Sequence, residues 1–142
     1  MTTMRQLLDR KGRAIYSIDP DDPVLEAIRL MAEHHVGALL VMRGMELSGI
    51  VSERDYARKI ILWGRSSSET PVWQIMSSPV TTVSPQARVE ECMRIVTERR
   101  IRHLPVVEEG RVIGVISIGD LVKAVIEDQQ QTIEQLESYI KS

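Results

Sequence analysis

The sequence is poor in the residues that build disulfides, metal sites and nucleic-acid-binding surfaces. Its one cysteine, Cys92, excludes an intramolecular disulfide, and its three histidines show no spacing typical of metal ligands. Aromatic residues make up only 4%, and the 18 Lys and Arg do not exceed the 20 Asp and Glu. A basic surface for nucleic acid is therefore not expected. No apolar run approaches the ~20 residues of a membrane span and the start has no secretory pattern, so we expect a cytoplasmic protein.

The sequence also lacks the motifs of nucleotide-using enzymes. There is no Gly-x-Gly-x-x-Gly and no Walker loop, and no histidine is placed to act as a base for Ser52. Cys92 falls in the register of an apolar helix face, so a packed thiol is expected rather than a nucleophile. We expect no catalytic residue and no metal, and an enzyme that hydrolyses or cyclises a nucleotide is the least favoured alternative.

A tandem repeat is the strongest positive feature. When the sequence is shifted by 65 residues, Ser17–Ile61 aligns with Thr82–Ile126 without a gap, and eleven of the 45 positions are identical. These are Pro20/Pro85, Val24/Val89, Glu26/Glu91, Arg29/Arg94, Glu33/Glu98, Leu39/Leu104, Val41/Val106, Gly49/Gly114, Ser52/Ser117, Asp55/Asp120 and Ile61/Ile126. With 43% hydrophobic residues, the chain is expected to fold as two similar halves.

Each half is expected to run strand, helix, strand, hairpin, strand, helix. The leading strands are predicted at Ile15–Ile18 and Val80–Val83, and Pro20 and Pro85 are predicted to start the helices that follow. The apolar helix faces are Val24, Ala27, Ile28 and Met31 in the first half, and Val89, Cys92, Met93 and Val96 in the second. The remaining strands are predicted at Gly37–Met42 and Leu47–Val51, and at Leu104–Val107 and Val112–Ile116.

The expected boundaries follow from the repeat. Residues 1–64 form a first domain with an N-terminal docking helix, 65–71 a linker, 72–126 a second domain, and 127–142 a C-terminal helix. Short apolar-periodic pieces at Met4–Leu8 and Val72–Met76 are predicted docking helices. Ile133, Leu136 and Ile140 share one stripe of the C-terminal segment. That stripe is expected to pack on the two repeats or on a second subunit.

Both halves end their last strand in the same way, with Gly, two apolar residues, Ser, two variable residues and Asp. These junctions are Gly49–Asp55 and Gly114–Asp120. A helix N-terminus attracts phosphate, the Ser hydroxyl can donate to it, and an Asp carboxylate suits the two ribose hydroxyls. The same pattern also describes a capping box, which needs no ligand. Its occurrence twice in register favours a ribose-phosphate site.

These junctions and the segment Arg102-His103-Leu104-Pro105-Val106-Val107 resemble the cystathionine β-synthase (CBS) domain, of which a pair forms a Bateman module. The resemblance extends from about Met4 to Ile126. Two segments are similar to the corresponding segments of small stand-alone CBS pairs, namely Ser52–Tyr56 and Gly64–Ser67. It implies an α+β fold of two tandem β-α-β-β-α repeats packed with pseudo-twofold symmetry.

The resemblance also implies roles for individual residues. Ser52 and Ser117 contact phosphate, Asp55 and Asp120 hold ribose, and the leading strands with Ile18 and Val83 wall the adenine. Arg102 and His103 approach the phosphates, where they could serve the site of the other repeat.

The cations around the two junctions differ. Arg54 at the first junction and Arg65 in the linker are further candidates for phosphate, whereas Arg58, Lys59 and Arg99 are better interpreted as solvated charges. Gly119 replaces Arg54 in the second repeat. We therefore expect two unequal nucleotide sites, with the Asp55 site the more cationic.

The function implied is a non-catalytic regulatory module that binds an adenosine nucleotide and signals energy or redox state to an unidentified effector protein. AMP is the first candidate, and ADP, ATP and NAD(H) stay open. A homodimer is expected through helix faces that carry Val24 and Ile28, and Tyr56 and Ile60. The alternative is a structural dimerisation or adaptor protein without ligand.

Overall fold

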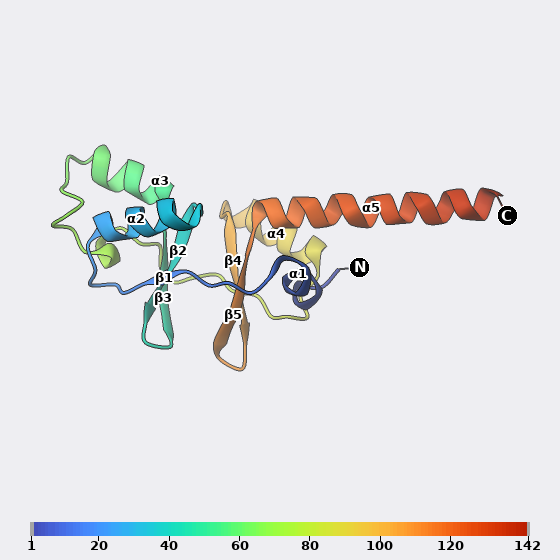
Figure 1. Cartoon of the computed structure of the whole chain (residues 1–142), viewed down its shortest axis with the longest axis horizontal. Coiled ribbons are helices and arrows are strands. Elements are labelled where there is room, and N and C mark those ends of the chain that lie inside the picture. Colours follow the sequence, from blue (N-terminus) through green and yellow to red (C-terminus); the bar gives the residue numbers. More distant parts are fainter. Residues whose placement is uncertain (1, 142) are drawn as a thin grey trace. The chain divides into compact units, whose positions relative to one another are not determined.

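The computed structural model describes residues 2–141 and divides them into two compact units, each with one repeat (Figure 1). Residues 15–80 form the first-repeat unit. Residues 2–14 join residues 81–141 in the second-repeat unit. Mixed helices and small sheets in two repeats confirm the α+β class.

The first-repeat unit is a three-stranded sheet with helices. Its elements are β1 (Ser17–Ile18), α2 (Val24–His34), β2 (Ala38–Arg43), β3 (Glu46–Ser52), α3 (Glu53–Tyr56), a π-helical turn (Ala57–Ile61) and a 3₁₀ turn (Val72–Gln74). β1 is parallel to β2, and β2 is antiparallel to β3. The core residues come from all of these elements except α3, together with Ile75 directly after the 3₁₀ turn: Ile18, Val24, Ala27, Met31, Leu39, Val41, Val51, Ile60, Val72 and Ile75.

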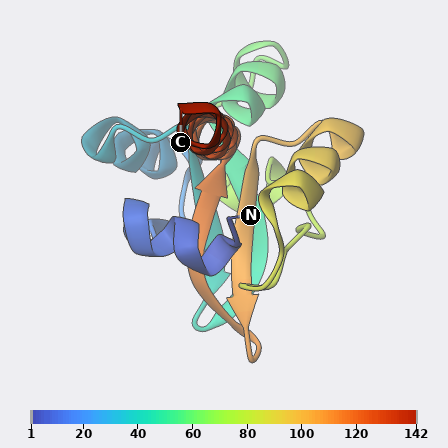
Figure 2. The same cartoon turned by 90° about the vertical axis from the view of Figure 1, so that its right-hand side faces the viewer.

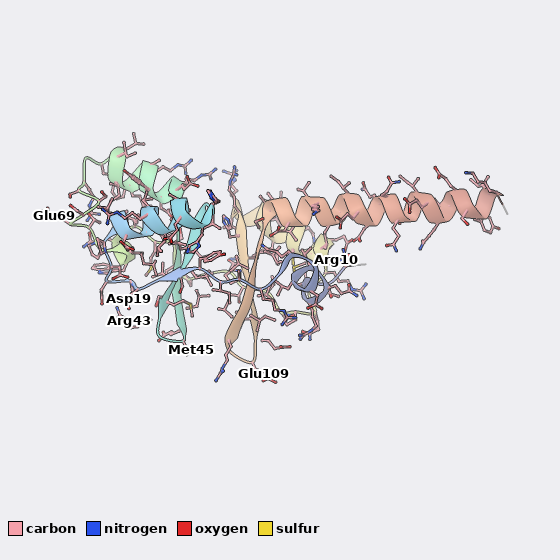
Figure 3. All side chains as sticks on the ribbon, viewed as in Figure 1. Arg10, Asp19, Arg43, Met45, Glu69 and Glu109 are labelled. Carbon is pink, nitrogen blue, oxygen red and sulfur yellow. The ribbon has the colours of Figure 1, made fainter. Side chains whose placement is uncertain are left out.

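The second-repeat unit has a two-stranded sheet and longer helices. Its elements are α1 (Met4–Lys11), α4 (Val89–Arg99), β4 (His103–Glu108), β5 (Arg111–Ser117) and α5 (Ile118–Lys141). β4 and β5 are antiparallel. They turn at Glu109 and Gly110, both of positive φ, the geometry that a two-residue hairpin favours. Figure 3 labels Glu109 at this tip and Met45 at the tip of the other hairpin.

The predicted apolar helix faces are confirmed, but the predicted helix starts are wrong. Val24 and Val89 begin the helices, four residues after the prolines. Pro20 lies instead in a turn closed by the Asp22 N–H on the Asp19 carbonyl, and Pro85 in a turn closed by the Ala87 N–H on the Ser84 carbonyl. Proline suits the second position of such a turn because its φ is fixed near the required value.

The predicted leading strand at Val80–Val83 is reduced to one bridge between Val83 and Val106. In the first repeat the Leu40 N–H donates to the Tyr16 carbonyl beside β1. Pro105 stands at the position equivalent to Leu40 and has no N–H to donate. The parallel ladder is therefore cut short in the second repeat.

The two docking pieces depart from the expected boundaries, because each lies in the unit of the other repeat. Helix α1 belongs to the second-repeat unit, and Val72–Met76 to the first-repeat unit. A Cβ on Gly114 would lie 2.5 Å from the Leu8 Cδ2 atom, and one on Gly49 would lie 2.6 Å from the Met76 Sδ atom. The glycines of both junctions thus let a docking piece lie directly on the last strand.

The C-terminal segment is not a separate helix, since α5 runs unbroken from Ile118 to Lys141. The equivalent helical segment of the first repeat ends at Ile61, and Gly64, which has φ 67, lies in the turn that follows. Gln129 occupies the Gly64 position in the second repeat, and a glutamine continues a helix where glycine ends it. Figure 2 looks almost along the axis of α5.

Candidate functional site

The first junction is a closed capping box at the start of α3. Ser52 is the N-cap residue, and its Oγ accepts from the Asp55 backbone N–H at 3.1 Å. Asp55 Oδ2 accepts in return from the Ser52 backbone N–H at 2.9 Å and from its hydroxyl at 3.0 Å. The Ser and Asp predicted from the sequence therefore contact each other, with the Asp55 carboxylate half-buried.

The second junction repeats this geometry at the start of α5. The Asp120 backbone N–H donates to Ser117 Oγ at 3.2 Å, and the Ser117 backbone N–H donates to Asp120 Oδ2 at 2.9 Å. His103 lies beside the pair, since it is the partner of Ser117 in the β4–β5 ladder. The structure thus brings Ser117, Asp120 and His103 together within one unit.

Each carboxylate has a lysine, and the two lysines come from different places. Lys59, one helical turn after Asp55, lies with its Nζ 3.4 Å from Asp55 Oδ1 and donates to the Ile75 carbonyl at 3.0 Å. Lys11 of α1 lies with its Nζ 2.5 Å from Asp120 Oδ2 and donates to the Val115 carbonyl at 2.9 Å. The interpretation of Lys59 as a purely solvated charge is therefore wrong.

Sequence reasoning missed Lys11 altogether. It precedes Asp120 by 109 positions, and only the docking of α1 on the second-repeat unit brings the two together. Ala124 stands where the first repeat has Lys59. That missing lysine is the one signal that could have prompted a search for a cation elsewhere in the chain.

The charges of the second junction depend on one another. Burial alone would raise the pKa of the Asp120 carboxyl, but the hydrogen bonds from Lys11 and Ser117 hold this pKa below its ordinary value. Burial lowers the pKa of His103, and the positive charges of Lys11 and Arg102 lower it further against the opposing effect of Asp120. The junction therefore combines an ionised carboxylate, an ammonium group and an imidazole that favours its neutral form.

The other predicted site residues have varied surroundings. Arg54 and Arg102 are exposed. Arg65 donates a side-chain hydrogen bond to the Gln74 amide oxygen within the first-repeat unit. Ile18 is 4% exposed and Val83 8%, so both belong mainly to the cores of their units.

An aromatic stack beside β1 was not foreseen. The rings of Tyr16 and His34 are nearly parallel, with centroids 4.1 Å apart. Tyr16 directly precedes β1 and is 37% exposed. A flat, partly exposed ring at the leading strand offers a surface on which a heteroaromatic base can stack.

Residues 2–141 contain neither a group of metal ligands nor a membrane-spanning helix. Within them no three His, Cys, Asp or Glu side chains are grouped so as to hold a metal ion. Across the same residues, none of the helices is both long and apolar enough to cross a membrane. Cys92 is fully buried, and burial with the nearby Glu91 charge raises the pKa of its thiol to about 11, which suits a packed residue.

Comparison with known proteins identifies both repeats. The model of the CBS domain matches residues 12–62 and again residues 72–127. The mitochondrial CBS domain-containing protein CBSX3 of Arabidopsis thaliana is 40% identical over 149 aligned residues, which cover 99% of this chain and 72% of that protein.

Solved structures agree. A candidate signal-transduction protein with CBS domains from Burkholderia ambifaria is 53% identical, with a TM-score of 0.87 over 90% of this chain and 96% of that one. A CBS domain protein from Pyrobaculum aerophilum, solved with AMP, is 26% identical, with a TM-score of 0.75 over 84% and 89% of the two chains. The chain belongs to the CBS domain family and consists of two CBS domains in tandem.

Proposed function

We propose that the two junctions bind adenosine nucleotides, and that this binding makes the chain a regulatory module rather than an enzyme. One observation carries the proposal: in both units a half-buried Asp at a helix N-terminus lies beside a Ser and a lysine ammonium. The Asp carboxylate offers acceptors for ribose hydroxyls, and the Ser hydroxyl with the N–H groups of the helix start offers donors for phosphate, while each lysine already pairs with the carboxylate. The AMP complex of the Pyrobaculum relative supports an adenylate as the ligand.

The capping boxes restrict the carboxylate oxygens that the proposed ribose would use. In both junctions Oδ2 of the Asp already accepts the Ser backbone N–H. Oδ1 is left for a ribose hydroxyl, with Lys59 near it in the first junction. A second ribose hydroxyl must share Oδ2 with the capping hydrogen bond, or displace the Ser52 hydroxyl in the first junction or the Lys11 ammonium in the second. Nucleotide binding is therefore expected to loosen the start of α3 or α5, which gives the ligand a mechanical effect.

That effect is what a partner protein would sense. We propose a homodimer that reports energy or redox state to an effector, with AMP the first ligand and ADP, ATP or NAD(H) as others.

The dimer surface differs in part from the expected one. In the first-repeat unit Val24 and Ile60 are buried in the core, so the expectation that they form part of the dimer surface is wrong. Ile28 and Tyr56 remain on it, where they help to line a groove of about 490 Å³. The proposed compartment is a reducing one, cytoplasmic or mitochondrial, the latter named for the Arabidopsis relative.

Isothermal titration with AMP, ADP, ATP and NAD(H) tests the proposal on the wild-type chain and on Asp55→Ala and Asp120→Ala. Each variant removes charged hydrogen bonds of about 1.5–3 kcal/mol, so roughly a tenfold to hundredfold weaker affinity is expected at its own site. Glu33→Ala and Glu98→Ala, at equivalent exposed positions of α2 and α4, are the matched controls. Unchanged affinity in both Asp variants would refute the site assignment.

A wild-type chain that binds none of these nucleotides would favour the adaptor function. The closed capping boxes favour that second candidate, since they stabilise both helix starts without any ligand. Melting temperatures of the Asp variants, measured alongside, separate a loss of binding from a loss of the cap.

A further inference from the structure

Helix α5 carries an apolar stripe from Val122 to Ile140 that the described residues 2–141 leave exposed. Val122 is 43% exposed, Ile126 60%, Ile133 47%, Leu136 58% and Ile140 80%. Figure 1 shows α5 continuing beyond α4 and α1 to the C-terminus. An apolar stripe of this length on one exposed helix is unusual unless another surface covers it.

The stripe has the spacing of a coiled coil. With Ile126 taken as position a of a heptad, Ile133 and Ile140 also fall at a, while Val122, Gln129 and Leu136 fall at d. An interval alternating between three and four residues keeps one seam in line along a pair of supercoiled helices. In parallel coiled coils, β-branched residues at a with Leu at d favour two helices over three or four, and here every a position is Ile while Leu136 is one of the three d residues.

The seam does not compete with the core of the unit. Leu121 and Ala124 are fully buried against the rest of the second-repeat unit. At 100° per residue, Val122 and Ile126 project from a different side of the helix, and both are exposed. A second helix can therefore pack on the seam while α5 keeps its contacts with its own unit.

Gln129 selects the orientation of the pair. In a parallel pair Gln129 faces Gln129 of the other copy, and the two amides can hydrogen-bond to each other. In an antiparallel pair a faces d, so each Gln129 would lie against Ile133 without a polar partner. Antiparallel helices would gain exposed ion pairs between Lys123 and Glu137. The free energy gained from an exposed ion pair is smaller than the cost of burying an amide without a hydrogen-bond partner, so the parallel arrangement is favoured.

We propose that the α5 helices of two copies of this chain form a parallel coiled coil through the seam of Val122, Ile126, Gln129, Ile133, Leu136 and Ile140. This inference deepens the homodimer part of the proposed function by naming its surface, and it does not depend on nucleotide binding. About three heptads is short for an independent coiled coil. The seam therefore acts together with other dimer contacts of the full chain.

Disulfide trapping in the full-length chain tests the seam directly. Facing d positions of a parallel pair lie within reach of a disulfide, so Gln129→Cys is expected to give crosslinked dimer as the main species after mild oxidation. Gln131→Cys, at the outward f position, is the matched control and should stay uncrosslinked. The wild-type chain controls for Cys92, which is buried.

A second pair of variants tests the apolar packing. In the Gln129→Cys background, Ile133→Glu places a charge in the seam and is expected to slow crosslinking at least about tenfold, whereas Gln131→Glu should not. Sedimentation equilibrium of the wild-type chain completes the test. A dimer that does not crosslink at residue 129 would overturn the coiled coil but keep the homodimer, and a monomer would overturn both. Crosslinking through Gln130→Cys instead would reveal an antiparallel pair and overturn the proposal.

Discussion

The two junctions have nearly the same hydrogen bonds but obtain their cation in different ways. In the first repeat Lys59 reaches Asp55 from one turn further along the same helical segment. In the second repeat that position is Ala124, and Lys11 reaches Asp120 from α1, at the other end of the chain. A duplicated site can thus keep its chemistry while its parts come from different segments.

The difference also changes which segments each proposed nucleotide site depends on. Lys59 stands on the helical segment that starts at its own junction, and its ammonium group also donates to the Ile75 carbonyl in the same unit. Lys11 depends on the packing of α1, through Leu8 on Gly114, in the second-repeat unit. A ligand or partner that moves α1 would alter the Asp120 site without touching it.

The largest expected effect concerns the two glycines beneath the docking pieces. A Cβ on Gly49 would lie 2.9 Å from the Ser77 carbonyl oxygen, which is backbone, whereas the three atoms nearest to a Cβ on Gly114 all belong to the Leu8 side chain. Gly49→Ala should therefore cost about 2–3 kcal/mol of unfolding free energy, and Gly114→Ala about 1 kcal/mol. Urea unfolding measures both.

Leu8→Ala supplies the control for this pair. Gly114→Ala should cost almost nothing in a Leu8→Ala background, because the clash has been removed, and the double-mutant cycle measures that coupling. Equal losses of unfolding free energy for the two glycine variants would contradict the expectation that the backbone contact makes Gly49 the less tolerant position.

A smaller effect is expected from removing the remote cation. Lys11→Ala, made in the Asp55→Ala background so that only the second site binds, frees Asp120 Oδ2 from its ion pair. Because an exposed ion pair contributes about 0–1 kcal/mol, nucleotide affinity should rise up to roughly fivefold in titration calorimetry. A weaker affinity would mean that Lys11 binds phosphate rather than competing with ribose. Lys123→Ala, an exposed lysine of α5, is the control.

The smallest expected effect is a pH dependence confined to the second repeat, because Ala38 stands at the position of His103 in the first. The pKa of His103 is lowered in the folded chain, so the unfolded chain binds more protons as the pH falls through the ordinary value of 6.5. Stability should therefore decrease below that pH. His103→Ala should remove part of this decrease in melting temperatures at pH 5.5 and 7.5. An identical pH profile for both proteins would contradict it.

Much of the fold was predictable because the relevant forces act along neighbouring residues. The apolar spacing of Val24, Ala27 and Met31 marks the buried face of α2, and the equivalent spacing marks α4. The Ser and Asp of each junction contact each other because they lie within one helical turn. The helix starts predicted at Pro20 and Pro85 were wrong because proline fits the second position of a β-turn as well as it fits the first turn of a helix.

The sequence by itself determined the duplication, the class of fold, and the pairing of Ser with Asp at each helix start. Only the tertiary structure decided which repeat each docking piece covers, why Gly49 and Gly114 lack side chains, and that Lys11 rather than a neighbour is paired with Asp120. Caps and helix faces arise from contacts three or four positions apart, which a linear pattern records. Docking depends on the shapes of two distant surfaces, which no local spacing encodes.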